Sequence, residues 1–414
     1  MAKAVAGYWL IMMQTEKSCE PKQKAPLPPL VWATSVVSFF TDFSSELIYP
    51  LLPIFLTTTL GLSRQFVGLI EGIAETTASF LKIVSGRLSD RAGMRTPFVI
   101  GGYSLSAVAR PLLCVASSGP QALFLRFLDR FGKGVRSVPR DALINDCVPP
   151  EIRGRAYGVQ RAMDHGGAIA GSLGGFVLLH YLGVPTRTVI LLSAIPGALA
   201  VATVFMFVRD VKSCPPATEK KKDISVRAAL PPRMRVYLFV LVFFALGNSS
   251  DAFLLLRAKQ MGVATAFVPL LWAALHVTKV IFSVYGGNLS DRVGRRRVIV
   301  GGWLVYAGVY AGFAFAVGAT AAWLLFIVYG IYFGFTEGVE KAFVADIVPR
   351  EVSGTAFGAF NLVVGLCALP SSLLMGRVWD SFGHRYAFLL GASLACVAAV
   401  LLLALVRESQ RVKV

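Results

Sequence analysis

Two loops of nearly identical sequence, 201 positions apart, constrain the fold of this chain more than any other feature. The first reads GRLSDRAGMR from Gly86 and the second reads GNLSDRVGRRR from Gly287, so Asp90 corresponds to Asp291 (291 − 90 = 201). Each loop lies between two long apolar segments. A chain that repeats a glycine-and-charge loop in this way is predicted to contain two copies of one helical bundle around a central cavity.

A second pair of loops supports the duplication. DCVPPEIRGRAYG from Asp146 matches DIVPREVSGTAFG from Asp346 at an offset of 200 (346 − 146), including an aspartate, a proline, a glutamate and two glycines. More loosely, the run Ser44–Glu46 resembles the run Ser249–Asp251. Two loops that recur in the same order at nearly one offset indicate an internal repeat rather than chance.

Composition places both copies in a membrane. The chain is 55% hydrophobic and 15% charged, and its apolar runs approach the roughly 20 residues that span a bilayer. Because backbone amides in hydrocarbon must pair within their own segment, we predict an all-α membrane protein of twelve transmembrane helices, two bundles of six. Pro50 and Pro53 should bend the long first helix. The predicted helices are 31–60, 66–86, 98–117, 121–145, 157–182, 188–208, 235–257, 266–288, 298–317, 321–345, 354–376 and 386–406.

The polar segments divide the chain into parts. We predict a tail (1–29), a six-helix bundle (30–208), a basic and proline-rich linker (209–234), a second six-helix bundle (235–408) and a short tail (409–414). Lysine and arginine are concentrated in the linker and in the loops on the same side. The positive-inside rule therefore places both termini and the linker in the cytoplasm, in a multi-pass protein of the cytoplasmic membrane.

Other classes of protein fit poorly. The net charge of +18 is distributed over short loops, without the basic stripe and aromatic platforms of a nucleic-acid site. The six cysteines are scattered and lack zinc spacing, so we predict no metal and no cofactor. No Walker loop, nucleophile elbow or His-Glu-x-x-His motif indicates an enzyme. The predicted partners are the lipid bilayer, protons and a small solute, and the protein is expected to be a monomer.

The doubled loop resembles the signature loop of the major facilitator superfamily, Gly-x-x-x-Asp-Arg/Lys-x-Gly-Arg-Arg/Lys. The second copy matches fully, whereas the first has Met94 in place of a basic residue. The resemblance covers roughly residues 30–408 and implies alternating access, with a latch that holds the bundles together while the outside is open. The residues that it implies for the latch are Gly86, Asp90, Arg91, Gly93, Arg140, Gly287, Asp291, Arg292 and Gly294.

Two points about the latch stay open at this stage. For Arg91 and Arg292, a latch role and a purely topological role have equal weight. Candidate contacts for the two loop aspartates come from the fourth helix of each bundle, and they are Arg136, Arg140 and Asp141 in the first, and Glu340 and Lys341 in the second.

Charges inside the predicted helices mark a pathway, since a charge at mid-bilayer costs about 2.5–3.5 kcal/mol on insertion scales. Asp42 and Glu46 are four apart and share one helical face. The resemblance places helices one, four, seven and ten around the central cavity. The predicted residues for solute binding or proton coupling are Asp42, Glu46, Arg126, Asp129, Arg130, Lys133, Arg161, Asp164, His165, Asp251, Glu337 and Glu340.

Several of these assignments keep an alternative. Asp42 and Glu46 either couple transport to protons or form static pairs with a cation such as Arg130, whose family pattern Arg-x-x-x-Gly-x-Gly is only partly met. Glu71 and Glu75 could also couple transport to protons together with Arg130, Lys133 or Lys82, but they lie nearer the outer end of the second helix, where exposure to water is the preferred interpretation. Coupling would arise because desolvation and a nearby arginine shift the pKa of a carboxyl group in opposite directions.

These features favour proton-coupled secondary transport of a small solute. An organic anion or a zwitterion is preferred, because Arg126, Arg130, Lys133 and Arg161 can meet carboxylate or phosphate groups. The alternative is a multidrug/proton antiporter that exports lipophilic or cationic compounds, although the Gly-Pro-x-x-Gly-Gly element of such antiporters is not matched around Ser172. A non-transporting membrane receptor or scaffold is a third hypothesis.

Overall fold

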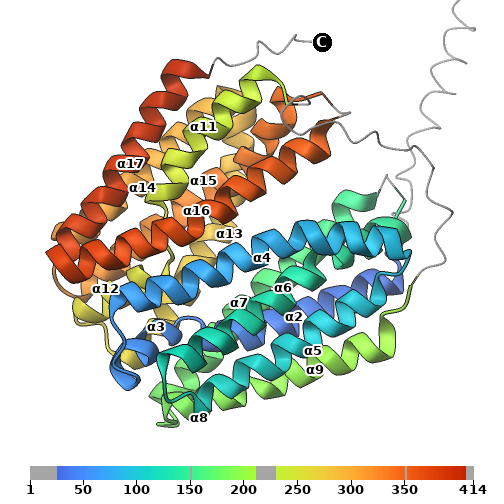
Figure 1. Ribbon diagram of the computed structural model, residues 1–414, viewed down its shortest axis with the longest axis horizontal. Helices are drawn as coiled ribbons and strands as arrows, with labels where there is room; N and C mark the ends of the chain where they lie inside the picture. The colour runs from blue at the N-terminus through green and yellow to red at the C-terminus, as the bar shows by residue number, and fades with distance from the viewer. Residues whose placement is uncertain (1–25, 150–151, 211–229, 350–351, 407–414) are drawn as a thin grey trace, which may run out of the picture.

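The computed structural model describes residues 26–149, 152–210, 230–349 and 352–406. These residues form helices and no strands, in two bundles (Figure 1). The predicted linker and tails fall largely outside the described residues. The first bundle contains α2 (Pro29–Ile48) with α3 (Leu52–Ile54) and η1 (Phe55–Thr59), α4 (Arg64–Ala92), α5 (Thr96–Leu112) with η2 (Leu113–Val115), α6 (Gly119–Cys147), α7 (Arg153–His180), and α8 (Thr186–Leu192) with α9 (Ala194–Phe207). The second contains α11 (Pro232–Gly247) with α12 (Ala252–Gln260), η4 (Thr265–Phe267) with α13 (Val268–Val293), α14 (Arg295–Phe315), α15 (Ala319–Ile347), α16 (Ser353–Phe382) and α17 (His384–Leu405).

The two bundles repeat one another in space. The bounds of α6 and α15 differ by 200 at both ends (319 − 119 and 347 − 147). Within the first bundle α6 packs against α4 and α5, and within the second α15 packs against α13 and α14. The predicted internal duplication is therefore visible in the bounds and in the packing of these helices.

Nine helical segments in the described residues are long and apolar enough to cross a membrane. The helices outside this set, α4, α6 and α7, contain 29, 29 and 28 residues and are long enough, but they carry many charged side chains. The chain is thus a multi-pass membrane protein, while a count of twelve membrane spans stays a prediction. The three polar helices supply much of the candidate site described below.

The first helical segment of each bundle is interrupted. α2 ends at Ile48 and α3 begins at Leu52, which confirms the predicted bend near Pro50 and Pro53. The corresponding break between α11 and α12, at residues 248–251, was not expected, because the sequence predicts one helix over 235–257.

The second break leaves its backbone groups bonded. The backbone N–H of Asn248 donates to the Phe244 carbonyl at 2.9 Å, and the Tyr306 hydroxyl donates to the Gly247 carbonyl at 2.8 Å. The amide of Ser250 donates to Ser372 Oγ at 3.3 Å. Irregular backbone is tolerated at membrane depth when it is satisfied in this way inside the protein.

The two bundles touch along a seam between α4 and α16 that is built on glycines. A Cβ atom on Gly68 would lie 2.2 Å from the Ser372 carbonyl oxygen, and one on Gly376 would lie 2.6 Å from the Arg64 carbonyl oxygen. Only glycine permits helices to approach this closely. We call this contact the glycine seam and the end of the molecule that contains it the seam end.

Further contacts close the seam end. The Asp380 carboxylate accepts the backbone N–H of Gln65 at 2.8 Å and so binds the N-terminus of α4 from the other bundle. The rings of Phe176 in α7 and Phe267 in η4 lie 5.4 Å apart, and α3 packs against α12 (Figure 1). The repeated loops at Gly93 and Gly294 lie at the opposite end, which we call the motif end, because α4 and α13 both run from the seam end to these loops.

Candidate functional site

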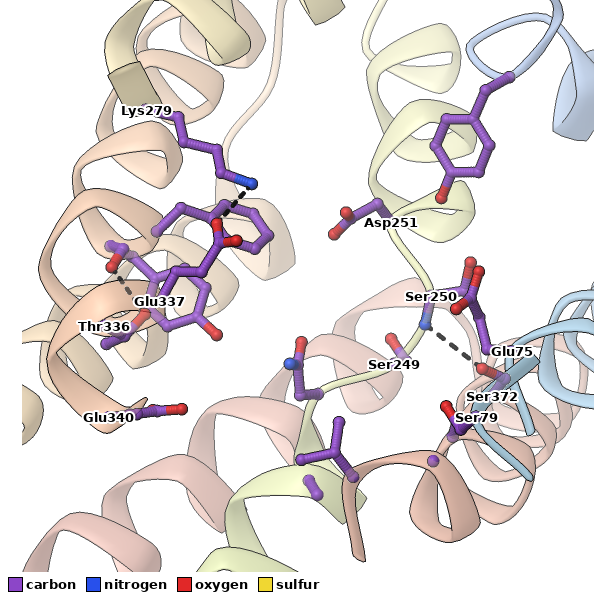
Figure 2. A pocket seen from close by; sticks show the side chains of 18 of the residues that line it. Glu75, Ser79, Ser249, Ser250, Asp251, Lys279, Thr336, Glu337, Glu340 and Ser372 are labelled. Carbon is purple, nitrogen blue, oxygen red and sulfur yellow. Dashed lines mark hydrogen bonds and ion pairs between the residues drawn. The ribbon is translucent and has the colours of Figure 1, made fainter. Parts of the chain in front are cut away.

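A cavity of about 550 Å³ lies between the bundles and is lined by both of them. The first bundle contributes side chains from α2, α4 and α6, and the second contributes the break at residues 248–251 and parts of α11, α13, α15 and α16. Figure 2 shows acidic groups from both bundles around this space, with Glu75 on one side and Glu337 and Glu340 on the other. The site is therefore the polar interior between two halves that pack on each other at the seam end.

The wall from the first bundle rests on a buried ion network. Spacing along α6 places Arg126 and Arg130 on one face, toward α4. Arg126 donates to both oxygens of Glu71, at 2.9 and 3.1 Å, and to Asp129 at 3.2 Å. Arg110 from α5 donates to the other oxygen of Asp129 at 2.8 Å. The sequence pattern indicates Glu71, Arg126 and Asp129 as charges inside helices, but it does not indicate Arg110.

Two cations of this wall keep donor capacity. Arg130 pairs with Glu75 at 3.2 Å, but its Nε is buried and has no hydrogen-bond acceptor among the described residues. Lys133, one helical turn further on, is half-buried and has no carboxylate within 4.0 Å in the described part of the chain. A buried donor without an acceptor is costly, as for Arg130 Nε, and a lysine without an ion pair can bind an anion, so these two groups are suited to receive one.

The wall from the second bundle has the opposite character. Asp251 accepts a hydrogen bond from the Tyr329 hydroxyl at 2.7 Å, and Glu340 accepts one from the Trp303 indole N–H at 2.9 Å. Lys279 instead forms an ion pair with Glu337 at 2.7 Å (Figure 2). Of the three carboxylates on this wall, those of Asp251 and Glu340 thus accept hydrogen bonds from neutral donors only.

Glu46 of the first wall contacts two residues of α13 in the second wall. The Trp272 indole N–H, from α13, donates to Glu46 Oε2 of α2 at 2.8 Å, and His276 Nε2 lies 4.0 Å from the same oxygen. The rings of His165 in α7 and His276 are 6.4 Å apart. Glu46 therefore lies where the bundles meet, and any rearrangement of one bundle against the other changes its surroundings.

The structure brings together part of the predicted set. The predicted residues that line the cavity are Glu46, Arg126, Arg130, Lys133, Asp251, Glu337 and Glu340. Those that do not line it are Asp42, Asp129, Arg161, Asp164 and His165. Asp129 lies behind Arg126, and the Arg161 side chain is 62% exposed. α7 supplies no lining residue in the described chain. The expectation that helices one, four and five share one cavity wall is corrected for helix five.

Of the two glutamates expected to be exposed to water, one is buried. Glu71, expected to be exposed to water, is 2% exposed and forms the bidentate pair with Arg126. Glu75 is partly open to the cavity, with a side chain 44% exposed, yet it pairs with Arg130. Helical spacing gives the face of a residue on its own helix, but it does not reveal which neighbouring helix covers that face.

The repeated loops form matching ion clusters at the motif end. Arg95 contacts Asp90 at 3.0 Å and Asp146 at 2.7 Å. In the second bundle Arg295 contacts Asp291 at 3.8 Å and also pairs with Asp346. Gly93 closes the first loop with a φ of +64°, which explains the glycine there.

The expected latch contacts take another form. Asp90 pairs with Arg95 of its own loop rather than with Arg136, Arg140 or Asp141. Arg140 donates to Ser38 Oγ at 2.9 Å, and Glu340 lies in the cavity wall. Arg95 occupies the Asp90 carboxylate and also binds Asp146 near the end of α6, while Arg140 is engaged by Ser38 and Asp141. Arg91 and Arg292 are exposed. Gly86 packs against Val138. Gly287 and Gly294 lie in the second loop at the positions that correspond to Gly86 and Gly93.

Comparison with known proteins agrees with this architecture. A family model for the Major Facilitator Superfamily matches residues 34–370. An uncharacterised MFS-type transporter of Methanocaldococcus jannaschii is 34% identical over 90% of this chain and 94% of that protein. The multidrug resistance protein MdtH of Cronobacter sakazakii is 33% identical over 32% of this chain and 33% of that protein. A solved structure of a nucleoside transporter NupG mutant superposes with a TM-score of 0.75 at 15% identity, covering 91% of this chain and 99% of that one. The chain belongs to the Major Facilitator Superfamily of membrane transporters.

Proposed function

We propose that this protein is a proton-coupled secondary transporter that moves a small organic anion or zwitterion across the cytoplasmic membrane by alternating access. The observation that carries the proposal is the cavity between the bundles, with the free donors of Arg130 and Lys133 in one wall. Charges in a membrane interior are costly unless they bind a ligand or each other. With the motif end in the cytoplasm, as the positive-inside rule predicts, the seam closes the outside and the cavity is accessible from the inside.

Glu46 is the proposed proton-coupling residue. It contacts Trp272 and His276 of the opposite bundle, and a carboxylate at such a junction gains or loses partners when the bundles move. Protonation would weaken its charge-assisted contact with the opposite bundle and so alter the balance between the inward-facing and outward-facing states.

The test is solute flux into proteoliposomes under an imposed pH gradient. Wild-type protein should drive uptake of organic anions or zwitterions when the gradient is present, and collapse of the gradient with a protonophore should stop it. Glu46→Gln should remove the dependence on the gradient. Asp210→Asn is the matched control, because Asp210 lies outside the cavity and accepts backbone N–H groups at the start of α5. Unaltered gradient-driven flux in Glu46→Gln would exclude this role.

A multidrug/proton antiporter is the second candidate. Two observations favour it, namely the partial similarity to MdtH and the second wall, where Asp251 and Glu340 accept hydrogen bonds from Tyr329 and Trp303. Export of lipophilic cations from an overexpressing strain, lost in Asp251→Asn and retained in Lys133→Gln, would favour this candidate over the first.

A further inference from the structure

The second wall contains two carboxylates that lack a cationic partner. Asp251 and Glu340 have no lysine, arginine or histidine nitrogen within 4.0 Å among the described residues, whereas Glu337 has Lys279 at 2.7 Å. Hydrogen bonds from Tyr329 and Trp303 satisfy one oxygen of each group but supply no positive charge. Figure 2 shows both carboxylates directed toward the cavity from opposite sides.

Aromatic rings surround the same region. Phe244, Tyr332 and Phe333 line the cavity, and the rings of Phe244 and Tyr332 lie 6.0 Å apart. The Lys279 ammonium already lies 4.7 Å from the centre of the Phe333 ring. Acidic groups set among aromatic faces are the chemistry that binds an ammonium group.

The first wall offers the complementary chemistry. Arg130 is 7% exposed, and its buried Nε has no acceptor in the described structure. The ammonium of Lys133, on the same face of α6, lies in the cavity lining without an ion pair at 4.0 Å or less. An unpartnered guanidinium nitrogen beside an unpaired lysine points to a carboxylate or a phosphate.

We propose that the transported solute is a zwitterion that bridges the two bundles. Its anionic group binds Lys133 and Arg130, and its ammonium group binds Asp251 and Glu340 against the aromatic rings. This inference rests on the proposed function and narrows it to one class of solute. A simple anion leaves Asp251 and Glu340 without a cation, and a simple cation leaves Lys133 without an ion pair and Arg130 Nε without an acceptor, so each of them loses one of the two contacts.

Bridging also gives the solute a part in the transport cycle. Because the poles belong to different bundles, a zwitterion attracts the walls toward each other, which favours closure of the motif end around it. A solute that binds one wall only lacks this attraction between the walls, so it shifts the equilibrium toward the closed state less.

Binding of size-matched probes to the purified full-length protein tests this proposal. The zwitterions are γ-aminobutyrate, δ-aminovalerate and ε-aminocaproate, the anions are butyrate, valerate and caproate, and the cations are the corresponding alkylamines. Calorimetry and the shift in thermal unfolding temperature measure affinity. At least one zwitterion should bind about tenfold or more tightly than its anion and its amine, since each pole adds a charge-assisted contact.

Variants then assign the poles. Asp251→Asn combined with Glu340→Gln should reduce zwitterion affinity to that of the anion, and Lys133→Gln should reduce it to that of the amine. Asp210→Asn, which removes a carboxylate outside the cavity, should leave affinity unchanged, and unfolding without probes checks that each variant is folded.

Two outcomes separate this inference from the proposed function. If anions bind as tightly as zwitterions and only Lys133→Gln weakens them, the zwitterion inference is wrong while anion transport stands. If amines alone bind, or if none of the probes binds, the inference is wrong; amine binding that depends on Asp251 also contradicts the proposed function in favour of the antiporter.

Discussion

In the first bundle an ion network fills the space between α5 and α6, whereas in the second bundle tyrosines fill the equivalent space between α14 and α15. Arg110 and Asp129 form a buried pair at 2.8 Å. The residues 200 positions later are Tyr310 and Tyr329 (329 − 129 = 200), whose rings lie 6.4 Å apart. The repeat has therefore kept the backbone and exchanged charge for aromatic surface.

The exchange explains why the cavity has two different walls. In the first bundle the network uses Glu71 and Asp129 to hold Arg126 in place, while Arg130 and Lys133 line the cavity, Lys133 without an ion pair in the described part of the chain. In the second bundle the tyrosine cluster carries no cation, and Asp251 is met by a hydroxyl group. The two halves of the duplicated fold thus give the cavity one wall with cations and one with carboxylates, because different side chains fill the space between α5 and α6 and the space between α14 and α15.

The largest expected effect comes from breaking the ion network. Asp129→Asn leaves Arg110 and Arg126 buried without one of their counter-charges, and removal of one partner from a buried pair costs about 3–5 kcal/mol. The free energy of unfolding, measured by denaturant titration in detergent micelles, should fall by that amount. A loss below about 1 kcal/mol would show that the network is solvated and that the contrast between the bundles is overstated.

A smaller effect is expected from the glycines of the repeated loops. A Cβ atom on Gly86 would lie 2.9 Å from Val138 Cγ1, whereas one on Gly287 would meet nothing within 4 Å. Gly86→Ala should therefore destabilise the protein by about 1–3 kcal/mol through overpacking. Gly287→Ala should leave stability unchanged or raise it by up to about 1 kcal/mol, since alanine favours helix. Equal effects in thermal unfolding would mean that the two loops pack alike.

The tyrosine at the position of Asp129 should matter less. Tyr329→Phe removes one hydrogen bond to Asp251 and keeps the ring, so the expected loss of stability is about 1 kcal/mol. The same denaturant titration measures it beside Asp129→Asn. The contrast between the bundles requires the aspartate variant to be the less stable of the two by a clear margin.

The smallest effect belongs to the motif end. The Asp90 side chain is 66% exposed, and Arg95 keeps Asp146 when Asp90 is changed. Asp90→Asn should therefore cost about 0.2–1 kcal/mol, as exposed ion pairs do. If these loops latch the bundles together in another state, the variant should slow transport far more than it lowers stability. A proportionate loss of both quantities would argue against the latch.

The sequence predicted the parts of this molecule that repeat. The offset between Asp90 and Asp291 indicated two bundles, and the three-to-four spacing along α6 placed Arg126, Arg130 and Lys133 on one face. These features depend on order and periodicity within single segments, which are visible in a linear chain.

The features that it missed depend on contacts between segments. Glu71 was expected to be wet because its position along the helix gave no sign that α6 would cover it. Arg110 was not singled out, since its partner Asp129 lies on another helix. The break at residues 248–251 contains neither proline nor glycine, so its stabilisation by Tyr306 and Ser372 appears only in the packed structure.

Distances between spin labels at the two ends of the bundles test alternating access most directly. The labels are placed, in a background without native cysteines, at Ala92 and Val293 on the motif end and at Thr59 and Gln260 near the seam end. All four side chains are exposed. On a change from alkaline to acidic pH, or on addition of a bound zwitterion, the motif-end distance should shorten as the seam-end distance lengthens. Two distances that stay fixed, or that change in the same direction, would contradict the transport mechanism proposed for this cavity.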